Sequence, residues 1–196
     1  MNLIYRVTNI SLNQKTEWEV IAPEATSTGD LYRSYIVPLA AIGPVASFVG
    51  LTVIGVAVPL FGNHRLPMLS AFSNALTQYV FALLSIYLIA LLINALAPTF
   101  GAEKSKLQAL KLAAYASTPA WIAGILLVLP SLAVLGLLAS VYSLYLLYLG
   151  LPVMMKAPPD KAVGYTAVIV LVAFVCAVVA GTVAGAVGFA GIRGGF

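Results

Sequence analysis

Residues 112–155 read LAAYASTPAWIAGILLVLPSLAVLGLLASVYSLYLLYLGLPVMM, forty-four residues without one charged side chain. A helix needs about 20 apolar residues to span a bilayer, so this run is long enough for two spans. Pro130 lies near its middle, where a proline can end one helix and begin the next. The stretch therefore predicts a membrane hairpin, with one span at 112–129 and a second at 132–151.

The rest of the chain follows the same pattern. It is 62% hydrophobic and 8% charged, whereas soluble domains carry about 25% charged residues. Other windows that are nearly free of charge predict spans at 35–60, 69–97 and 163–191. The predicted fold is an all-α polytopic membrane protein, one domain over residues 1–196 with five transmembrane helices, preceded by a short amphipathic arm at 1–33.

The distribution of basic residues predicts the orientation. Cytoplasmic loops of membrane proteins carry an excess of Lys and Arg. Eight of the ten basic residues fall in the arm, the loop between spans two and three, and the loop between spans four and five: Arg6, Lys15, Arg33, Lys104, Lys106, Lys111, Lys156 and Lys161. We therefore expect a cytoplasmic N-terminus and an outside C-terminus. Because the charges are spread over several loops, they do not predict a nucleic-acid site.

The arm has two predicted helices. The first covers 2–12 and is amphipathic, with an apolar face formed by Leu3, Ile4, Val7 and Ile10. The second begins in a capping box with Thr16 at the N-cap and Glu19 three residues later, and it presents Trp18 and Ile21 before ending at Pro23. Such an arm packs under the bundle and sets its tilt, or it binds a partner.

Small and polar residues within the spans predict how helices pack. Gly43, Ser47 and Gly50 in span one allow close approach of a neighbouring backbone, and Gly181, Gly185 and Gly188 in span five predict a second such face. Asn74 and Gln78 lie four residues apart and are expected to face the bundle, since lipid offers amides no partner. They form interhelical hydrogen bonds, or they line a path for a lipid headgroup or small solute. Cys176 is predicted to be a packing residue.

Residues 145–156, YLLYLGLPVMMK, are followed by Pro158, Lys161 and Gly164-Tyr165. This order resembles the signature of the Yip1-domain membrane proteins. Pro119 lies where that family has a proline in its third span, and Trp18 with Ile21 and Glu24 resembles the family's lead-in to span one. The resemblance extends over nearly the whole chain.

The resemblance implies a non-catalytic role. Eukaryotic members of the family act in vesicle traffic and bind Rab-type GTPases and one another. The short arm here, without a long acidic cytosolic domain, departs from those members and argues against GTPase binding. The compact chain resembles prokaryotic members, which implies a location in the prokaryotic cytoplasmic membrane.

No combination of residues predicts catalysis or a cofactor. His64 is the single histidine and Cys176 the single cysteine, so the chain lacks a metal-ligand set. Its six acidic residues lie outside the predicted spans, at Glu17, Glu19, Glu24, Asp30, Glu103 and Asp160. Ion-coupled transporters normally keep an ionisable group within the membrane. We therefore expect neither an enzyme nor an ion-coupled transporter.

The first functional hypothesis is a protein of membrane organisation or trafficking that acts through protein–protein or protein–lipid contacts. Its partners would be membrane lipids, another membrane protein or a second copy of the chain. The candidate contact residues are Trp18, Glu24, Tyr145, Tyr148, Lys156 and Lys161. The alternative is a lipid or small-solute conduit built from the polar faces of spans two and four, with Asn74, Gln78 and Tyr142 as its candidate lining.

Overall fold

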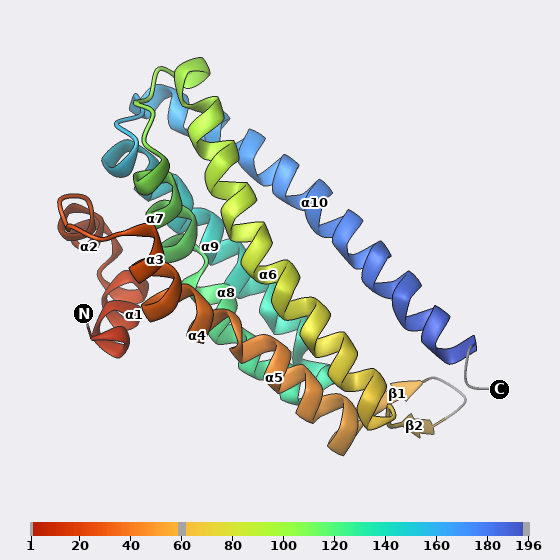
Figure 1. The fold of residues 1–196 in the computed structure, drawn as a ribbon. Helices are drawn as coiled ribbons and strands as arrows, with labels where there is room; N and C mark the ends of the chain where they lie inside the picture. The colour runs from red at the N-terminus through yellow and green to blue at the C-terminus, as the bar shows by residue number, and fades with distance from the viewer. Residues whose placement is uncertain (1, 59–61, 194–196) are drawn as a thin grey trace.

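The computed structural model describes residues 2–58 and 62–193. These residues form an elongated bundle of helices with a short hairpin at one end (Figure 1). The hairpin pairs β1 (Val56–Val58) with β2 (Gly62–His64) in antiparallel register, with Val56 opposite His64. The predicted all-α class is confirmed for the helical body, and the hairpin is an addition to it.

Ten α-helices make up most of this body, with short π-helical and 3-10 turns between several of them. The α-helices are α1 (Leu3–Leu12), α2 (Gln14–Ile21), α3 (Thr28–Leu31), α4 (Val37–Ala40), α5 (Ile42–Val49), α6 (Met68–Leu96), α7 (Lys106–Ala116), α8 (Thr118–Ala123), α9 (Ala133–Met154) and α10 (Pro159–Arg193). The π-helical turns cover Tyr32–Ile36 and Gly50–Ile54, and the 3-10 turns cover Ala97–Phe100, Gly124–Val128 and Pro130–Leu132.

Four helical segments of the described chain are long and apolar enough to cross a membrane: Thr28–Ile54, Met68–Phe100, Lys106–Val128 and Val134–Met154. They correspond to the first four predicted spans. The fifth predicted span, 163–191, is helical within α10 but is not among the four. Cys176 and the glycine face at 181–188 lie outside the part of α10 whose side chains are described.

The helical segment of span one, Thr28–Ile54, differs from the predicted 35–60 at both ends. The helical segment begins at Thr28, because the Ser27 hydroxyl accepts a hydrogen bond from the Asp30 N–H at 3.1 Å and caps it. It therefore includes Asp30, which was expected to lie before the span. The segment ends at Ile54, because Gly55 has φ 84°, a left-handed conformation that favours glycine and stops the helix before β1.

The hairpin of spans three and four is confirmed. The helical path of span three ends at Val128, Leu129 is extended, and Pro130 opens the short turn that leads into α9. Span three is itself divided at Ser117, between α7 and α8. Pro119 lies in the first turn of α8, where its missing N–H is not needed.

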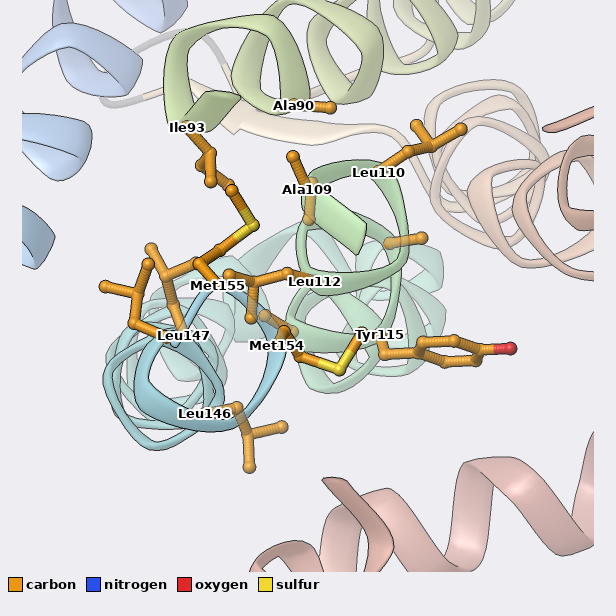
Figure 2. Packing of buried hydrophobic residues seen from close by; sticks show 14 of the residues in the cluster. Ala90, Ile93, Ala109, Leu110, Leu112, Tyr115, Leu146, Leu147, Met154 and Met155 are labelled. Atoms are coloured by element: carbon orange, nitrogen blue, oxygen red, sulfur yellow. The ribbon is translucent and has the colours of Figure 1, made fainter. Parts of the chain in front are cut away.

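The buried core lies where α6, α7 and α9 meet. Figure 2 shows Ile93 of α6 beside Met155 at the end of α9, with Ala109 and Leu112 of α7 between the two helices. Alanines at several buried positions of α7 keep it close to both neighbours. The helices α6 and α9 thus hold α7, which in turn contacts the N-terminal arm.

Glycines of span one allow a close approach of a neighbouring helix, as predicted, and the structure shows that this neighbour is span three. Gly43 of α5 faces Gly124, so closely that a Cβ on Gly124 would lie 2.8 Å from the Gly43 Cα. Gly50 lies against the backbone, and a Cβ there would be 2.4 Å from the Leu127 carbonyl oxygen. Positions 50 and 124 have no room for a side chain, which explains why small residues occur at this crossing.

Candidate functional site

The loops at one end of the bundle form a single polar surface, which we call the charged end: residues 101–106 and 155–161. Lys156 Nζ lies 2.8 Å from Glu103 Oε2, and the Glu103 N–H donates to the Met155 carbonyl at 2.8 Å. Gly101, with φ 72°, lies against Lys161. The α6–α7 and α9–α10 loops are therefore fastened to each other, at the end opposite the β-hairpin (Figure 1).

Lys156 has an unusual backbone conformation. Of the non-glycine residues that the structure describes, Lys156 alone has a positive φ, at 51°. It directly follows Met155, which caps the C-terminal end of α9. A side chain in this region costs about 1 kcal/mol relative to glycine. The turn nevertheless carries a lysine, whose amine meets Glu103.

The arm is tied down by a buried ionic cluster that the sequence analysis missed. Arg6 lies 2.5 Å from Glu17 and 2.5 Å from Glu24 through its two terminal nitrogens. Its guanidinium also lies over the ring of Tyr115, 5.8 Å from the centroid. Arg6 was not part of the apolar face predicted for residues 2–12, but it shares the inward face with Leu3 and Ile10, three residues before and four after it.

Lys111 is a second correction. It was expected in a solvated loop, yet it lies in α7 with 1% of its surface exposed. Its amine donates to the carbonyls of Ile21 at 3.1 Å and Glu24 at 2.5 Å. Gln108 on the same helix donates to the Ala22 carbonyl at 2.8 Å. Lys111 therefore satisfies the open C-terminal end of α2 and anchors the arm to span three.

Trp18 is a core residue in this structure. Its side chain is fully buried and meets Tyr115 edge to face, with ring centroids 6.5 Å apart. Gly150 of α9 lies directly against the Trp18 ring. Tyr115 also meets Tyr35, whose hydroxyl is 2.7 Å from the Thr118 hydroxyl. Trp18 thus has no surface left for a partner in this conformation.

The capping box predicted for α2 is wrong. The helix begins at Gln14, and the Thr16 hydroxyl donates to the Asn13 carbonyl at 3.0 Å instead of capping an N–H. The reason is that α2 follows α1 almost directly, with only Asn13 between them. Asn13 therefore serves as the junction of the two helices, and Thr16 lies inside the second.

The three tyrosines of α9 divide into two kinds. The Tyr142 hydroxyl donates to the Ser11 carbonyl at 2.6 Å, so this phenol holds the end of α1. Tyr145 and Tyr148 are exposed on the outer surface, and the Tyr145 ring lies 6.0 Å from that of Tyr142. Tyr145 and Tyr148 lie on the approach to the charged end.

Asn74 and Gln78 of span two form hydrogen bonds within the protein. Gln78 donates to Asn74 at 2.5 Å and lies 3.5 Å from the Ser47 hydroxyl of α5. Two cavities, of about 80 Å³ between α7, α9 and α10 and about 190 Å³ between α8 and α9, have largely apolar linings. Neither is lined by Asn74, Gln78 or Tyr142. The interhelical hydrogen bonding predicted for the amides is thus present.

The structure therefore brings only some of the candidate contact residues together. Lys156 and Lys161 share the charged end, Trp18 and Glu24 belong to the buried face of the arm, and Tyr145 and Tyr148 lie between these regions. Arg6, Glu17, Lys111 and Gly150 were missed. The helical spacing of Arg6 with Leu3 and Ile10 is a signal that could have identified it.

These features define the chain as a multi-pass integral membrane protein, helical throughout its body, with the exposed Lys104, Lys106, Lys156 and Lys161 at one end. The family model for the Yip1 domain matches residues 9–181, and the chain belongs to this family. It is 26% identical over 156 residues to the inner membrane protein YohC of Escherichia coli K12, covering 76% of this chain and 78% of that protein. The YohC protein of E. coli O6:H1 matches equally. No solved structure matches the chain.

Proposed function

We propose that the protein is a non-catalytic component of the prokaryotic cytoplasmic membrane, which organises membrane proteins or lipids through contacts of its charged end. One observation carries this proposal: two loops distant in sequence are fastened into one surface by Glu103, Lys156 and the Met155 carbonyl. The names of the E. coli relatives, both inner membrane proteins, support the location.

The topology that goes with this proposal has five spans, a cytoplasmic N-terminus and an outside C-terminus. The basic residues of the arm and of the charged end lie toward one end of the bundle, as the positive-inside rule requires of a cytoplasmic side. In Figure 1 the α10 helix runs the length of the bundle from the charged end toward the hairpin end. A crossing of α10 in that direction takes the C-terminus to the other side.

The chemistry of the charged end suits an anionic partner. Lys104, Lys106 and Lys161 are exposed, and Lys156 is only partly neutralised by Glu103 because both side chains are about two-thirds exposed. Each basic residue near the surface contributes about 1 kcal/mol of attraction to anionic headgroups. Anionic lipid, or the acidic face of another membrane protein, is the expected partner. Neither a nucleic acid nor a Rab-type GTPase is expected.

The conduit alternative gains no support from the geometry. The amides of Asn74 and Gln78 bond to each other and reach Ser47, while Tyr142 holds α1 through Ser11. The hydrogen bonds of these groups lie within the bundle: the Gln78 amide nitrogen donates to Asn74 and Ser47, and the Tyr142 hydroxyl donates to Ser11.

Crosslinking and affinity purification from native membranes, with lipid analysis of the same sample, test the proposal. We expect a reproducible protein partner or enriched anionic lipid with the wild type. The double variant Lys104→Glu with Lys106→Glu should lose it. Arg65→Glu is the matched control, because Arg65 is exposed beside the hairpin at the opposite end.

The result is interpretable only if the variants keep the wild-type size-exclusion profile. A partner that survives reversal of the Lys104 and Lys106 charges, or that is lost equally with Arg65→Glu, would refute a role for the charged end.

A further inference from the structure

The exposed apolar side chains of the bundle form a band that locates the bilayer. On α6 the large exposed hydrophobic residues run from Met68 to Leu91. At 1.5 Å per residue this is about 35 Å, close to the roughly 30 Å thickness of a hydrocarbon core. On α9 they run from Val134 to Tyr148. The band ends before the charged loops at 101–106 and 155–161.

Tyrosines mark the edge of this band that faces the charged end. Tyr87 on α6 and Tyr145 and Tyr148 on α9 are all exposed near that edge. Tyrosine is enriched where hydrocarbon meets headgroups, because its ring is apolar and its hydroxyl is polar. These positions place the boundary of one leaflet about a turn or two before α9 reaches the charged loops.

Helix α1 lies at this boundary. Its last turn is bonded to α9 through the Tyr142 hydroxyl and the Ser11 carbonyl, and Tyr142 is three residues from Tyr145. The helix also packs against α8, in the body of span three. In Figure 1 α1 lies on the flank of the bundle beside α8 and does not extend beyond the charged loops.

The large exposed side chains of α1 are apolar, and its charged residue lies on the inward face. Thr8, exposed among them, donates its hydroxyl to the Ile4 carbonyl at 2.9 Å. Ile4, Tyr5 and Leu12 are 76%, 66% and 72% exposed, and they fall on one stripe of the helix. Arg6, the charged residue of α1, is 6% exposed and is paired with Glu17. A helix facing water would show the reverse arrangement, with its charge outside and its large apolar residues inside.

Helix α2, directly beyond Asn13, shows the ordinary arrangement. Its exposed positions include Lys15, Thr16 and Glu19 together with Val20. The change from an apolar to a polar outer face within one short connection indicates that the two helices face different surroundings. The outer face of α2 is suited to water and that of α1 to lipid.

We propose that α1 is an interfacial helix embedded in the leaflet on the N-terminal side, with Ile4, Tyr5 and Leu12 in contact with lipid at the boundary of hydrocarbon and headgroups. The apolar stripe of α1 is therefore covered by the bilayer itself. The helix is bonded to α9 at Tyr142, three residues from the exposed Tyr145, and the pairing of Arg6 with Glu17 and Glu24 removes the charge that would oppose insertion. The inference is independent of which partner meets the charged end.

Spin-label accessibility in reconstituted vesicles tests this inference. Single cysteines are placed at Ile4 and at Leu12 in a full-length Cys176→Ala background, and the labelled proteins are reconstituted into phosphatidylethanolamine–phosphatidylglycerol vesicles. Val134→Cys supplies the lipid reference, since Val134 is exposed on α9, and Glu19→Cys supplies the water reference on α2. Power saturation then measures the accessibility of each label to oxygen, which partitions into lipid, and to a nickel chelate, which stays in water.

The labels at Ile4→Cys and Leu12→Cys should give an oxygen-to-nickel accessibility ratio like that at Val134→Cys and several times that at Glu19→Cys. Nickel accessibility equal to that at Glu19→Cys would overturn the proposal, because the stripe would then face water. Low accessibility to both reagents with spin–spin broadening would also overturn it, since a second copy would then cover the stripe.

Discussion

A methyl group added at Gly150 should overpack the site that holds Trp18. The Cβ of an alanine there would lie 2.5 Å from Leu112 Cδ1, 2.8 Å from Trp18 Cε2 and 2.9 Å from Trp18 Cζ2. The leucine methyl is the end of a flexible side chain and can shift. The Trp18 ring is fully buried against Tyr115 and cannot. Such overpacking costs about 1–3 kcal/mol.

A second effect has the opposite sign. Alanine favours a helix interior by about 1 kcal/mol relative to glycine. Gly136, in the same helix, isolates this effect, because no heavy atom lies within 4 Å of a Cβ built there. Gly136→Ala should therefore gain about 1 kcal/mol, and Gly150→Ala should be about 1–3 kcal/mol less stable than Gly136→Ala.

Equilibrium unfolding in mixed micelles measures the difference. The fraction of SDS is raised and helix loss is followed by far-ultraviolet circular dichroism for both variants. In a Trp18→Ala background the ring is gone, so the penalty of Gly150→Ala should shrink, giving a coupling energy between the two positions. If Gly150→Ala is as stable as Gly136→Ala, the contact with Trp18 does not constrain position 150 and the reasoning fails.

Three further predictions use the same unfolding assay. Gly124→Ala should cost about 1–3 kcal/mol, because its Cβ would meet the Gly43 backbone at 2.8 Å; stability equal to the wild type would argue against that close crossing. Arg6→Met should lower the free energy of unfolding by about 3–5 kcal/mol, because it leaves Glu17 buried without its ionic partner. The double variant Arg6→Met with Glu17→Met should recover most of this loss. No recovery would mean that the pair is not the cause. Lys156→Gly should be about 1 kcal/mol more stable than Lys156→Ala. Both variants lose the exposed ion pair with Glu103, and only glycine relieves the strain of the positive φ. Equal stability would count against backbone strain at this position.

The Gly150 prediction bears on what the family signature does. Gly150 lies within the YLLYLGLPVMMK stretch at 145–156, which also holds the candidate contact residues Tyr145, Tyr148 and Lys156. In the structure this stretch has several tasks: Gly150 makes room for Trp18, while Tyr145 and Lys156 remain exposed. Buried packing positions and exposed positions thus alternate along this stretch.

Most of the helical architecture could be predicted from local features of the sequence. The charge-free run at 112–155 and its Pro130 predicted two helices and the turn between them, because bilayer thickness and the missing proline N–H act over a few residues. The glycines at 43 and 50 predicted a close helix crossing for the same reason, although their partners Gly124 and Leu127 could not be named. The end of span one was missed because the φ of Gly55 is not visible in the sequence.

The pairing of the charges depended on how distant segments meet. Lys111 resembles every other loop lysine until the arm folds back and presents the Glu24 carbonyl to it, across 87 positions of sequence. Arg6 is buried because Glu17 and Glu24 converge on it from the next helix and its end. Hydrophobic run length is a property of a segment, and it decided where the helices are. Burial of a charge is a property of its neighbours in space, and only the folded bundle decided which charges hold the arm and which remain at the surface.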